Sequence, residues 1–136
     1  MIRPATLDDI PVMVEMGRKF ADRSGVEVGF CPDSVASLLA GLIENGICLV
    51  GENCMAGAVL FDHPFNRSHK AAQELFWWSE GRNGLRLLDA LETAVREAGA
   101  HSLTMITLEA VNPETTGKLY ARKGFRVLEH SYMKVF

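Results

Sequence analysis

The stretch WWSEGRNGLRLL, residues 77–88, joins two tryptophans to an apolar helical segment through a polar turn that contains Gly81 and Gly84. The first N–H groups of a helix have no partner within it, and the helix dipole adds partial positive charge there. Glycines allow such amides to approach an anion closely. The same residues also fit an ordinary strand-to-helix turn that carries two surface arginines, Arg82 and Arg86. The stretch therefore indicates either a phosphate-binding turn or a plain connection.

Two kinds of proton-transfer groups lie near this stretch in the sequence. Glu74 opens the aromatic run ELFWW, and Glu109 ends the next apolar run, 101–110. A carboxylate can accept a proton from an attacking nucleophile. Tyr120 carries a phenol, whose ordinary pKa of about 10 keeps it protonated at neutral pH and able to donate. The structural alternatives are a solvated strand-end carboxylate for Glu74 and helix-to-sheet packing for Tyr120.

Other reactive side chains follow no catalytic or metal-binding spacing. The three cysteines and four histidines are Cys31, Cys48, Cys54, His63, His69, His101 and His130. The cysteines form no CxxC pair or disulfide framework, and no carboxylate or thiol is spaced to complete a metal site with the histidines. No GxSxG motif or Ser-His-Asp arrangement indicates a hydrolase. We expect reduced thiols and no metal.

Composition and length indicate one globular domain over residues 1–136. The chain is 48% hydrophobic and 23% charged, with a formal net charge of −3. This balance is typical of a soluble protein and argues against a dedicated nucleic-acid binder, because phosphate affinity normally needs a basic surface. The N-terminus lacks the apolar core of a signal peptide, and no apolar run approaches the roughly 18 residues of a membrane span. We expect a cytoplasmic protein with no membrane partner.

The hydrophobic pattern predicts a mixed order of strands and helices. Strands are expected at 1–6, 47–51, 54–61, 71–79, 101–110 and 125–136, with a tight turn at Glu52–Asn53 and a polar loop at 62–70. Helices are expected at 7–24, 34–46, 85–98 and 113–123, with Ser34 and Asn112 as N-caps. The strand at 101–110 alternates little and is expected to be buried on both faces. The class is α/β or α+β with one mixed sheet.

Three segments carry a resemblance to a known family. They are IRPATLDDI, ELFWWSEGRNGLRLLDAL and NPETTGKLYARKGF, which follow one another in the chain with the predicted order of elements. The sequence resembles the GNAT family, the GCN5-related N-acetyltransferases, over nearly its whole length. The segments ELFWW, GLRLLDA and LYARKGF are also similar to those of small phage and prophage members. The resemblance implies a mixed, twisted sheet with helices on both faces.

The resemblance also implies a donor substrate, acetyl-CoA, and roles for particular residues. In the family the glycine-containing turn holds the pyrophosphate, and the strand before it carries a bulge and a free N–H that binds the thioester carbonyl. Trp77 or Trp78 would supply that N–H, and we take Trp78 as the catalytic residue, with Glu74 (or Glu109) as base and Tyr120 as acid. The implied cofactor-binding residues are Trp77, Trp78, Ser79, Gly81, Arg82, Asn83, Gly84, Leu85, Arg86, Asn112 and Tyr120.

The turn departs from the family pattern Arg/Gln-x-x-Gly-x-Gly/Ala. Arg82 stands where the middle glycine is usual, Ser79 stands where the Arg or Gln is usual, and the loop is several residues shorter. Asn112 lies one residue further from Tyr120 than in the family, and N-capping accounts for it equally well.

The favoured function is acetyl transfer from acetyl-CoA to an amine of a small molecule or protein, by direct attack in a ternary complex. One alternative is a non-catalytic or weakly active coenzyme A-binding module of the same fold, which the shortened turn suggests. The other is a phage-type nucleic-acid-modifying enzyme. A homodimer is compatible with the family resemblance.

Overall fold

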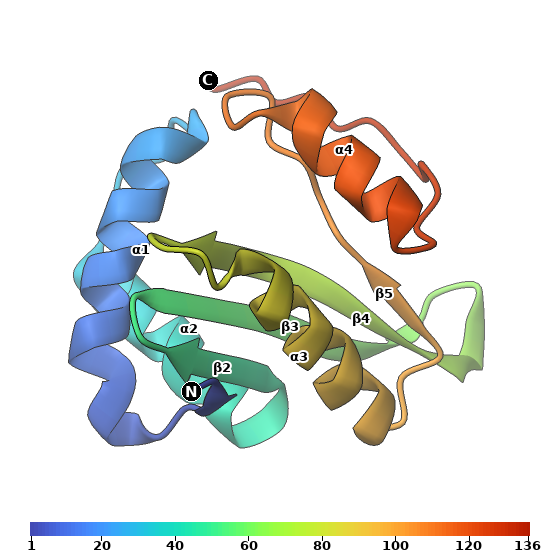
Figure 1. Ribbon diagram of the computed structural model, residues 1–136, viewed down its shortest axis with the longest axis horizontal. Coiled ribbons are helices and arrows are strands. Elements are labelled where there is room, and N and C mark those ends of the chain that lie inside the picture. The colour runs from blue at the N-terminus through green and yellow to red at the C-terminus, as the bar shows by residue number, and fades with distance from the viewer.

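A five-stranded mixed sheet organises the computed structural model of the protein, which describes residues 1–136 (Figure 1). The strands follow chain order across the sheet: β1 (Arg3–Pro4), β2 (Ile47–Gly51), β3 (Cys54–His63), β4 (Asn66–Ser79) and β5 (Ser102–Thr104). Strands β1 to β4 are antiparallel, whereas β5 runs parallel to β4. A parallel neighbour needs a crossover, and the helix between β4 and β5 supplies it.

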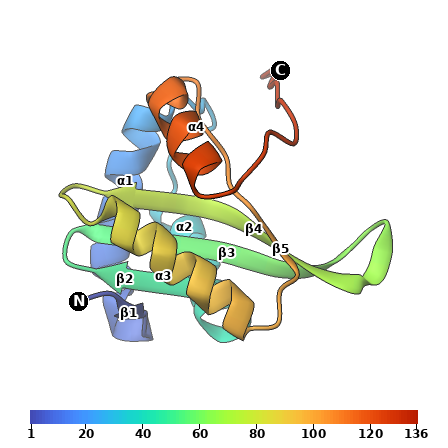
Figure 2. The same ribbon diagram turned by 45° about the vertical axis from the view of Figure 1, so that its right-hand side comes forward.

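Helices cover both faces of this sheet. The short 3₁₀ helix η1 (Leu7–Asp9) leads into α1 (Ile10–Ser24), which packs with α2 (Pro32–Asn45) on one face. The other face carries α3 (Gly84–Glu97), and α4 (Pro113–Arg122) lies beyond it on the same side (Figures 1 and 2). The predicted class, a mixed sheet flanked by helices on both faces, is confirmed. No helix combines the length and apolar character that crossing a bilayer requires.

Two hydrophobic cores result, one on each side of the sheet. On the α1–α2 side, Met13 and Met16 of α1 and Leu39 and Leu42 of α2 pack onto the sheet. On the α3 side, the apolar face of α3 is buried against small residues of β3 and β4. The side chains of Leu87, Leu88 and Leu91 are fully buried. Because both faces of the sheet are covered, apolar side chains of its strands are buried on each face.

A β-bulge interrupts the long pairing of β3 with β4. Gly57 pairs with Phe76 and Ala58 pairs with Glu74, so Leu75 is an extra residue on β4. Side chains alternate between faces along a strand, and one extra residue reverses that alternation. Ala72 belongs to the α3 side before the bulge, whereas Phe76 and Trp78 belong to the α1–α2 side after it. Beyond Leu75, the bulge therefore determines which face of the sheet each side chain of β4 points to.

Several predicted boundaries are wrong. The loop expected at 62–70 is mostly strand, because β3 and β4 extend to His63 and from Asn66 as an exposed hairpin. Polar residues do not prevent pairing where both faces of a two-stranded ribbon meet water. Helix α2 begins at Pro32, not after Ser34, since proline suits the first helical position. Asn112 precedes α4 as predicted, but its side chain makes no capping bond and its backbone is left-handed (φ 40°).

The C-terminal part of the sheet is smaller than predicted. Only Ser102–Thr104 of the expected strand 101–110 pairs with β4, and its residues are exposed or half-buried, so the prediction of a doubly buried strand is wrong. The strand expected at 125–136 is not formed. Both segments look strand-like locally, but a strand also needs a neighbour with free backbone groups, and β5 offers only a short edge.

The contact at the bulge predicts a stability effect. A Cβ at Gly57 would lie 2.5 Å from the Phe76 ring, whereas a Cβ at Gly41 in α2 would meet nothing within 4 Å. We expect Gly57→Ala to destabilise the protein by about 1–3 kcal/mol through overpacking. Gly41→Ala should be stabilising by up to about 1 kcal/mol, because alanine favours the helix. Urea unfolding of both variants measures this, and an unchanged midpoint for Gly57→Ala would contradict the tight contact.

Candidate active site

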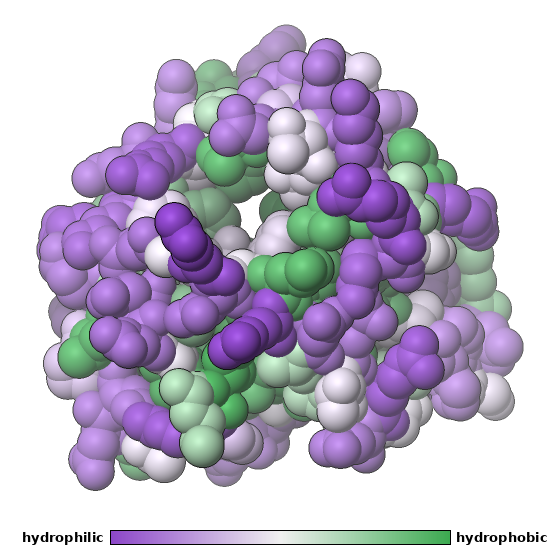
Figure 3. Space-filling view, in the orientation of Figure 1, coloured by the Kyte–Doolittle hydropathy of each residue, from purple (hydrophilic) through white to green (hydrophobic).

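The two parallel strands separate partway along β4 and leave an opening between them. Only Ala71–Gln73 of β4 pair with β5, so the stretch from Glu74 to Ser79 has no strand on that side. After β5 the chain leaves the sheet and rises to α4 (Figure 1). Figure 3 shows the molecule hollowed at its centre, between this part of the chain and the sheet, with apolar side chains along the rim. Backbone groups of β4 are therefore open to a ligand.

The register identifies which backbone amides face this opening. In an antiparallel pair, N–H groups point alternately toward the partner strand and away from it. The amide of Glu80 donates to the carbonyl of Asn53, on the β3 side. Counting back from Glu80, the amide of Trp78 points to β3 and the amide of Trp77 points away from it, toward the opening. The register thus favours Trp77 over Trp78 as the free donor.

Glu74 lies at the start of this unpaired stretch and is almost fully buried, with an exposed fraction of 4%. Its Oε1 accepts a long bond from the amide of Ile106 at 3.5 Å. Burial raises the pKa of Glu74 to about 7, because a carboxylate is poorly solvated there and the Ile106 amide only partly offsets this. A group with such a pKa can take up and release a proton near neutral pH.

Tyr120 reaches the same place from α4. Its hydroxyl donates to the carbonyl of Ile106 at 2.7 Å, so Glu74 and Tyr120 engage the two backbone groups of one residue. The ring lies 5.9 Å from the Trp77 ring and 5.4 Å from the Phe125 ring, centroid to centroid. Burial and the nearby charge of Glu74 raise the pKa of Tyr120 far above its usual value, which keeps the phenol protonated.

The turn between β4 and α3 is held by side chains at its ends. The amide of Gly81 donates to Ser79 Oγ (3.3 Å), and Trp77 Nε1 donates to the carbonyl of Gly84 (3.0 Å). Asn83 Nδ2 donates to the carbonyl of Glu52 across the neighbouring turn (3.4 Å). No side chain caps the first amides of α3, because Asn83 points elsewhere. A helix start without a cap leaves donors for an anion.

The two arginines of the turn are free to bind an anion. Arg82 and Arg86 are exposed and form no ion pair with an acidic residue. Leu85 is half exposed, whereas the buried pair Leu87 and Leu88 anchors the helix below. The predicted phosphate-turn residues therefore lie together at one end of the opening.

Two predicted residues are not brought into this cluster. Glu109 is exposed and makes no hydrogen bond or ion pair, so burial singles out Glu74 among the two carboxylates. Asn112 is exposed, and its side chain has no hydrogen-bond partner.

Two further participants were missed by the sequence reasoning. They are Ile106, whose backbone joins Glu74 to Tyr120, and Lys19 of α1, whose Nζ lies 2.8 Å from Glu80 Oε1 beside the turn. No local pattern signals either residue, since the partners lie far apart in the chain.

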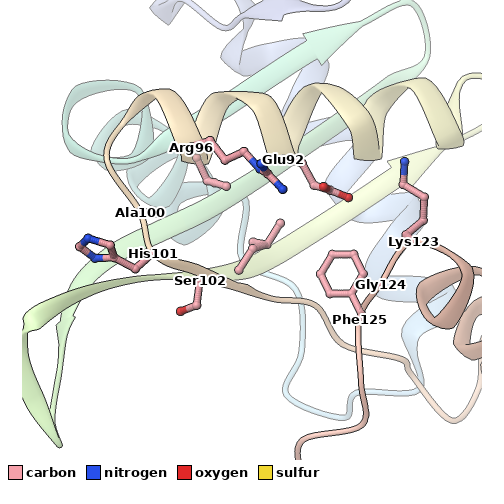
Figure 4. A pocket seen from close by; sticks show the side chains of 10 residues that line it. Glu92, Arg96, Ala100, His101, Ser102, Lys123, Gly124 and Phe125 are labelled. Atoms are coloured by element: carbon pink, nitrogen blue, oxygen red, sulfur yellow. The ribbon is translucent and has the colours of Figure 1, made fainter.

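A separate hollow of the surface lies elsewhere. It has a volume of about 410 Å³ and lies between α3, β5 and the chain that follows α4 (Figure 4). Arg96 and Glu92 line it from α3, and Lys123 and Phe125 line it from the opposite side. It contains neither Glu74, Trp77 nor Tyr120. The separated strands, and not this hollow, bring the predicted acid, base and amide donor together. No group of three or more metal-ligating side chains is close enough to hold an ion.

Solved structures share this fold. A predicted acetyltransferase from Clostridium acetobutylicum, crystallised with acetyl-CoA, is 15% identical with a TM-score of 0.74, covering 100% of this chain and 95% of that one. A GCN5-related N-acetyltransferase from Ralstonia eutropha JMP134 is 17% identical (TM-score 0.75; 99% and 97% covered). A ribosomal-protein-alanine N-acetyltransferase from Brucella melitensis is 16% identical (TM-score 0.77; 100% and 98% covered).

These similarities show that the chain has the fold of GNAT acetyltransferases. Identities of this size establish the fold alone. No protein-family model and no curated protein matches the sequence.

The buried carboxyl predicts a pH-dependent stability. Glu74 has a pKa of about 7 in the folded protein and an ordinary value of 4.5, so the folded state holds the proton more tightly. The resulting stability is present below about pH 4.5 and is lost as the pH rises through 7. Relative to Glu74→Gln, which cannot ionise, the wild type should lose up to about 3 kcal/mol between pH 5 and pH 8.

Urea unfolding of both proteins at these two pH values tests this. The exposed Glu109→Gln serves as the control and should track the wild type. A gap between wild type and Glu74→Gln that stays constant with pH would contradict the raised pKa.

Proposed function

We propose that this protein is an N-acetyltransferase that transfers an acetyl group from acetyl-CoA to an amine. The observation that carries the proposal is the convergence of three groups on the opening between β4 and the chain after β5. They are the outward-facing amide of Trp77, the buried carboxyl of Glu74 and the phenol of Tyr120. The similarity in fold to acetyltransferases, one of them crystallised with acetyl-CoA, supports the same assignment.

The residues present fit such a donor. The unpaired stretch of β4 offers backbone groups to an extended arm, as an adjacent strand would. At its end, the uncapped start of α3 and the unpaired Arg82 and Arg86 offer amides and guanidinium groups to phosphate oxygens. When bound, acetyl-CoA supplies a thioester carbonyl that an amine can attack.

Each residue then has one task. The Trp77 amide donates a hydrogen bond to the carbonyl oxygen as negative charge develops, and one such donor is worth about 3 kcal/mol. Glu74 accepts the proton that the attacking nitrogen loses, for which a pKa of about 7 is well suited. Tyr120 donates its phenolic proton to the departing sulfur, and its raised pKa keeps that proton in place until then. Holding both reactants in one opening supplies the remaining acceleration through proximity.

A second candidate is a coenzyme A-binding module of this fold without catalysis. The observation that favours it is the turn itself, where Ser79 and Arg82 stand in place of the usual residues and Glu80 adds a negative charge. Both candidates require binding that titration calorimetry with acetyl-CoA measures, and only the enzyme releases a thiol when an amine is present. The enzyme proposal expects binding at micromolar concentrations, and no detectable heat near millimolar ligand would contradict it.

Removing the phenol separates catalysis from binding. We expect Tyr120→Phe to lower turnover about 10²-fold or more while the affinity for acetyl-CoA stays near that of the wild type, since the ring contacts with Trp77 and Phe125 remain. Thiol release and calorimetry measure the two quantities. If affinity collapses while the fold is retained, Tyr120 shapes the site but is not the acid.

The pH profile tests the base. With Glu74 as acceptor, kcat of the wild type should rise with pH to a plateau, with its midpoint near 7, because only the ionised carboxyl can take the proton. Glu74→Gln should lose about 10²–10⁴-fold in turnover and should also lose this limb of the profile. Glu109→Gln is the matched control and should keep both. A profile with the same midpoint in Glu74→Gln would assign the base elsewhere.

A further inference from the structure

Helix α1 places the ammonium of Lys19 at the turn between β4 and α3, where the proposed function has the phosphates bind. Lys19 Nζ lies 2.8 Å from Glu80 Oε1 and donates a hydrogen bond to it. Glu80 directly follows β4 and directly precedes Gly81. The pair joins the α1–α2 layer to the first residue of the turn that leads into α3.

Aromatic packing fixes the position of this contact. Phe20, next to Lys19 on α1, stacks on Trp78 with a centroid distance of 5.8 Å and an interplanar angle of 24°. The guanidinium of Arg23, one turn further along α1, lies 5.3 Å from the centre of the Trp78 ring. Trp78 is two residues before Glu80 and is 7% exposed. Helix α1 is therefore clamped to the end of β4, and Lys19 is held within reach of Glu80.

The pair matters because of the charge that Glu80 carries. A carboxylate beside the first amides of a helix competes for the donors and the positive potential that would otherwise attract a phosphate. It also repels a phosphate directly. Glu80 is an exposed residue whose side chain is 27% exposed, so Lys19 and water share the compensation of its charge. The nearest compensating cation is Lys19, because Arg82 and Arg86 form no ion pair with Glu80.

The other cationic side chains near Lys19 form no ion pair with Glu80. Arg18 pairs with Glu15 on α1, and Arg23 lies over the Trp78 ring. The hydrogen bond and the charge of Glu80 raise the pKa of Lys19, with a smaller contribution from Glu15, so the ammonium stays charged at neutral pH.

We propose that Lys19 is a positioning residue for the acetyl donor: it holds the Glu80 carboxylate aside and neutralises it, so that the turn between β4 and α3 can accept a phosphate group. This inference rests on the proposed function and deepens it. It also gives this turn, which lacks the usual glycine and basic residue, a way to tolerate its own carboxylate, because the compensating charge comes from a residue 61 positions away.

A double-mutant cycle read by titration calorimetry with coenzyme A tests the proposal. Lys19→Met removes the ammonium but keeps a long apolar side chain, and it should weaken binding about tenfold or more. Glu80→Gln should bind at least as well as the wild type. In the double variant, affinity should return to that of Glu80→Gln, because the harmful carboxylate is gone. Arg18→Met, on the same helix and similarly exposed, is the control and should bind like the wild type.

Three results would overturn the proposal. If Lys19→Met binds coenzyme A as the wild type does, the pair has no role at the turn. If the double variant stays as weak as Lys19→Met, Lys19 is a direct ligand and does not act through Glu80. If the wild type itself fails to bind, this inference and the proposed function both fall. Thermal unfolding confirms that each variant is folded, which is expected because Lys19 is half exposed.

Discussion

The one-residue bulge at Leu75 is the constraint on which the rest of the site depends. Without it, the alternation along β4 would continue unbroken from Ala72, and Phe76 would face α3 and not the α1–α2 core. The extra residue reverses the order. It places Phe76 and Trp78 in the core while leaving Glu74 and Trp77 on the side that Tyr120 approaches. A local irregularity in hydrogen bonding thus sets both the packing and the chemistry.

The second element of the site is the separation of β4 from β5, which gives Ile106 its importance. Because the chain leaves the sheet after Thr104, the backbone of Ile106 is free to bond side chains in place of a strand. Its amide meets Glu74 and its carbonyl meets Tyr120, so one residue orients both of the side chains that we propose as proton-transfer groups. Burying a carboxyl with only one weak hydrogen bond costs stability when it ionises. That cost suits a group whose task is to exchange protons and does not suit one whose task is to stabilise the fold.

The sequence predicted the features that depend on neighbours along the chain. The helix expected at 85–98 and the turn at Glu52–Asn53 were found because helix periodicity and tight-turn residues are local signals. The prediction failed where pairing is decided at a distance. The segment 125–136 has the composition of a strand but no partner, and the polar residues 62–70 form a hairpin because two long strands meet there.

The same contrast between local signals and distant contacts holds for the residues of the site. The sequence suggested Glu74, Tyr120 and the turn residues as candidates, but the choice between Trp77 and Trp78 could not be made. It depends on the register of β4 against β3, which only the pairing of the two strands reveals. The pair of Lys19 with Glu80 joins helix α1 to the turn after β4. These two segments share no motif, so neither one predicts the contact.

The central claim is that the donor lies along the unpaired stretch of β4, with its phosphates at the start of α3. Backbone amide resonances followed by NMR during titration with coenzyme A test this most directly, since they report the place of contact as well as its strength. We expect the amides of Trp77 and of residues 81–86 to shift together and saturate, while those of the exposed hairpin end near His63 stay unchanged. Shifts confined to the hollow between α3 and Phe125, or no saturable shifts, would contradict it.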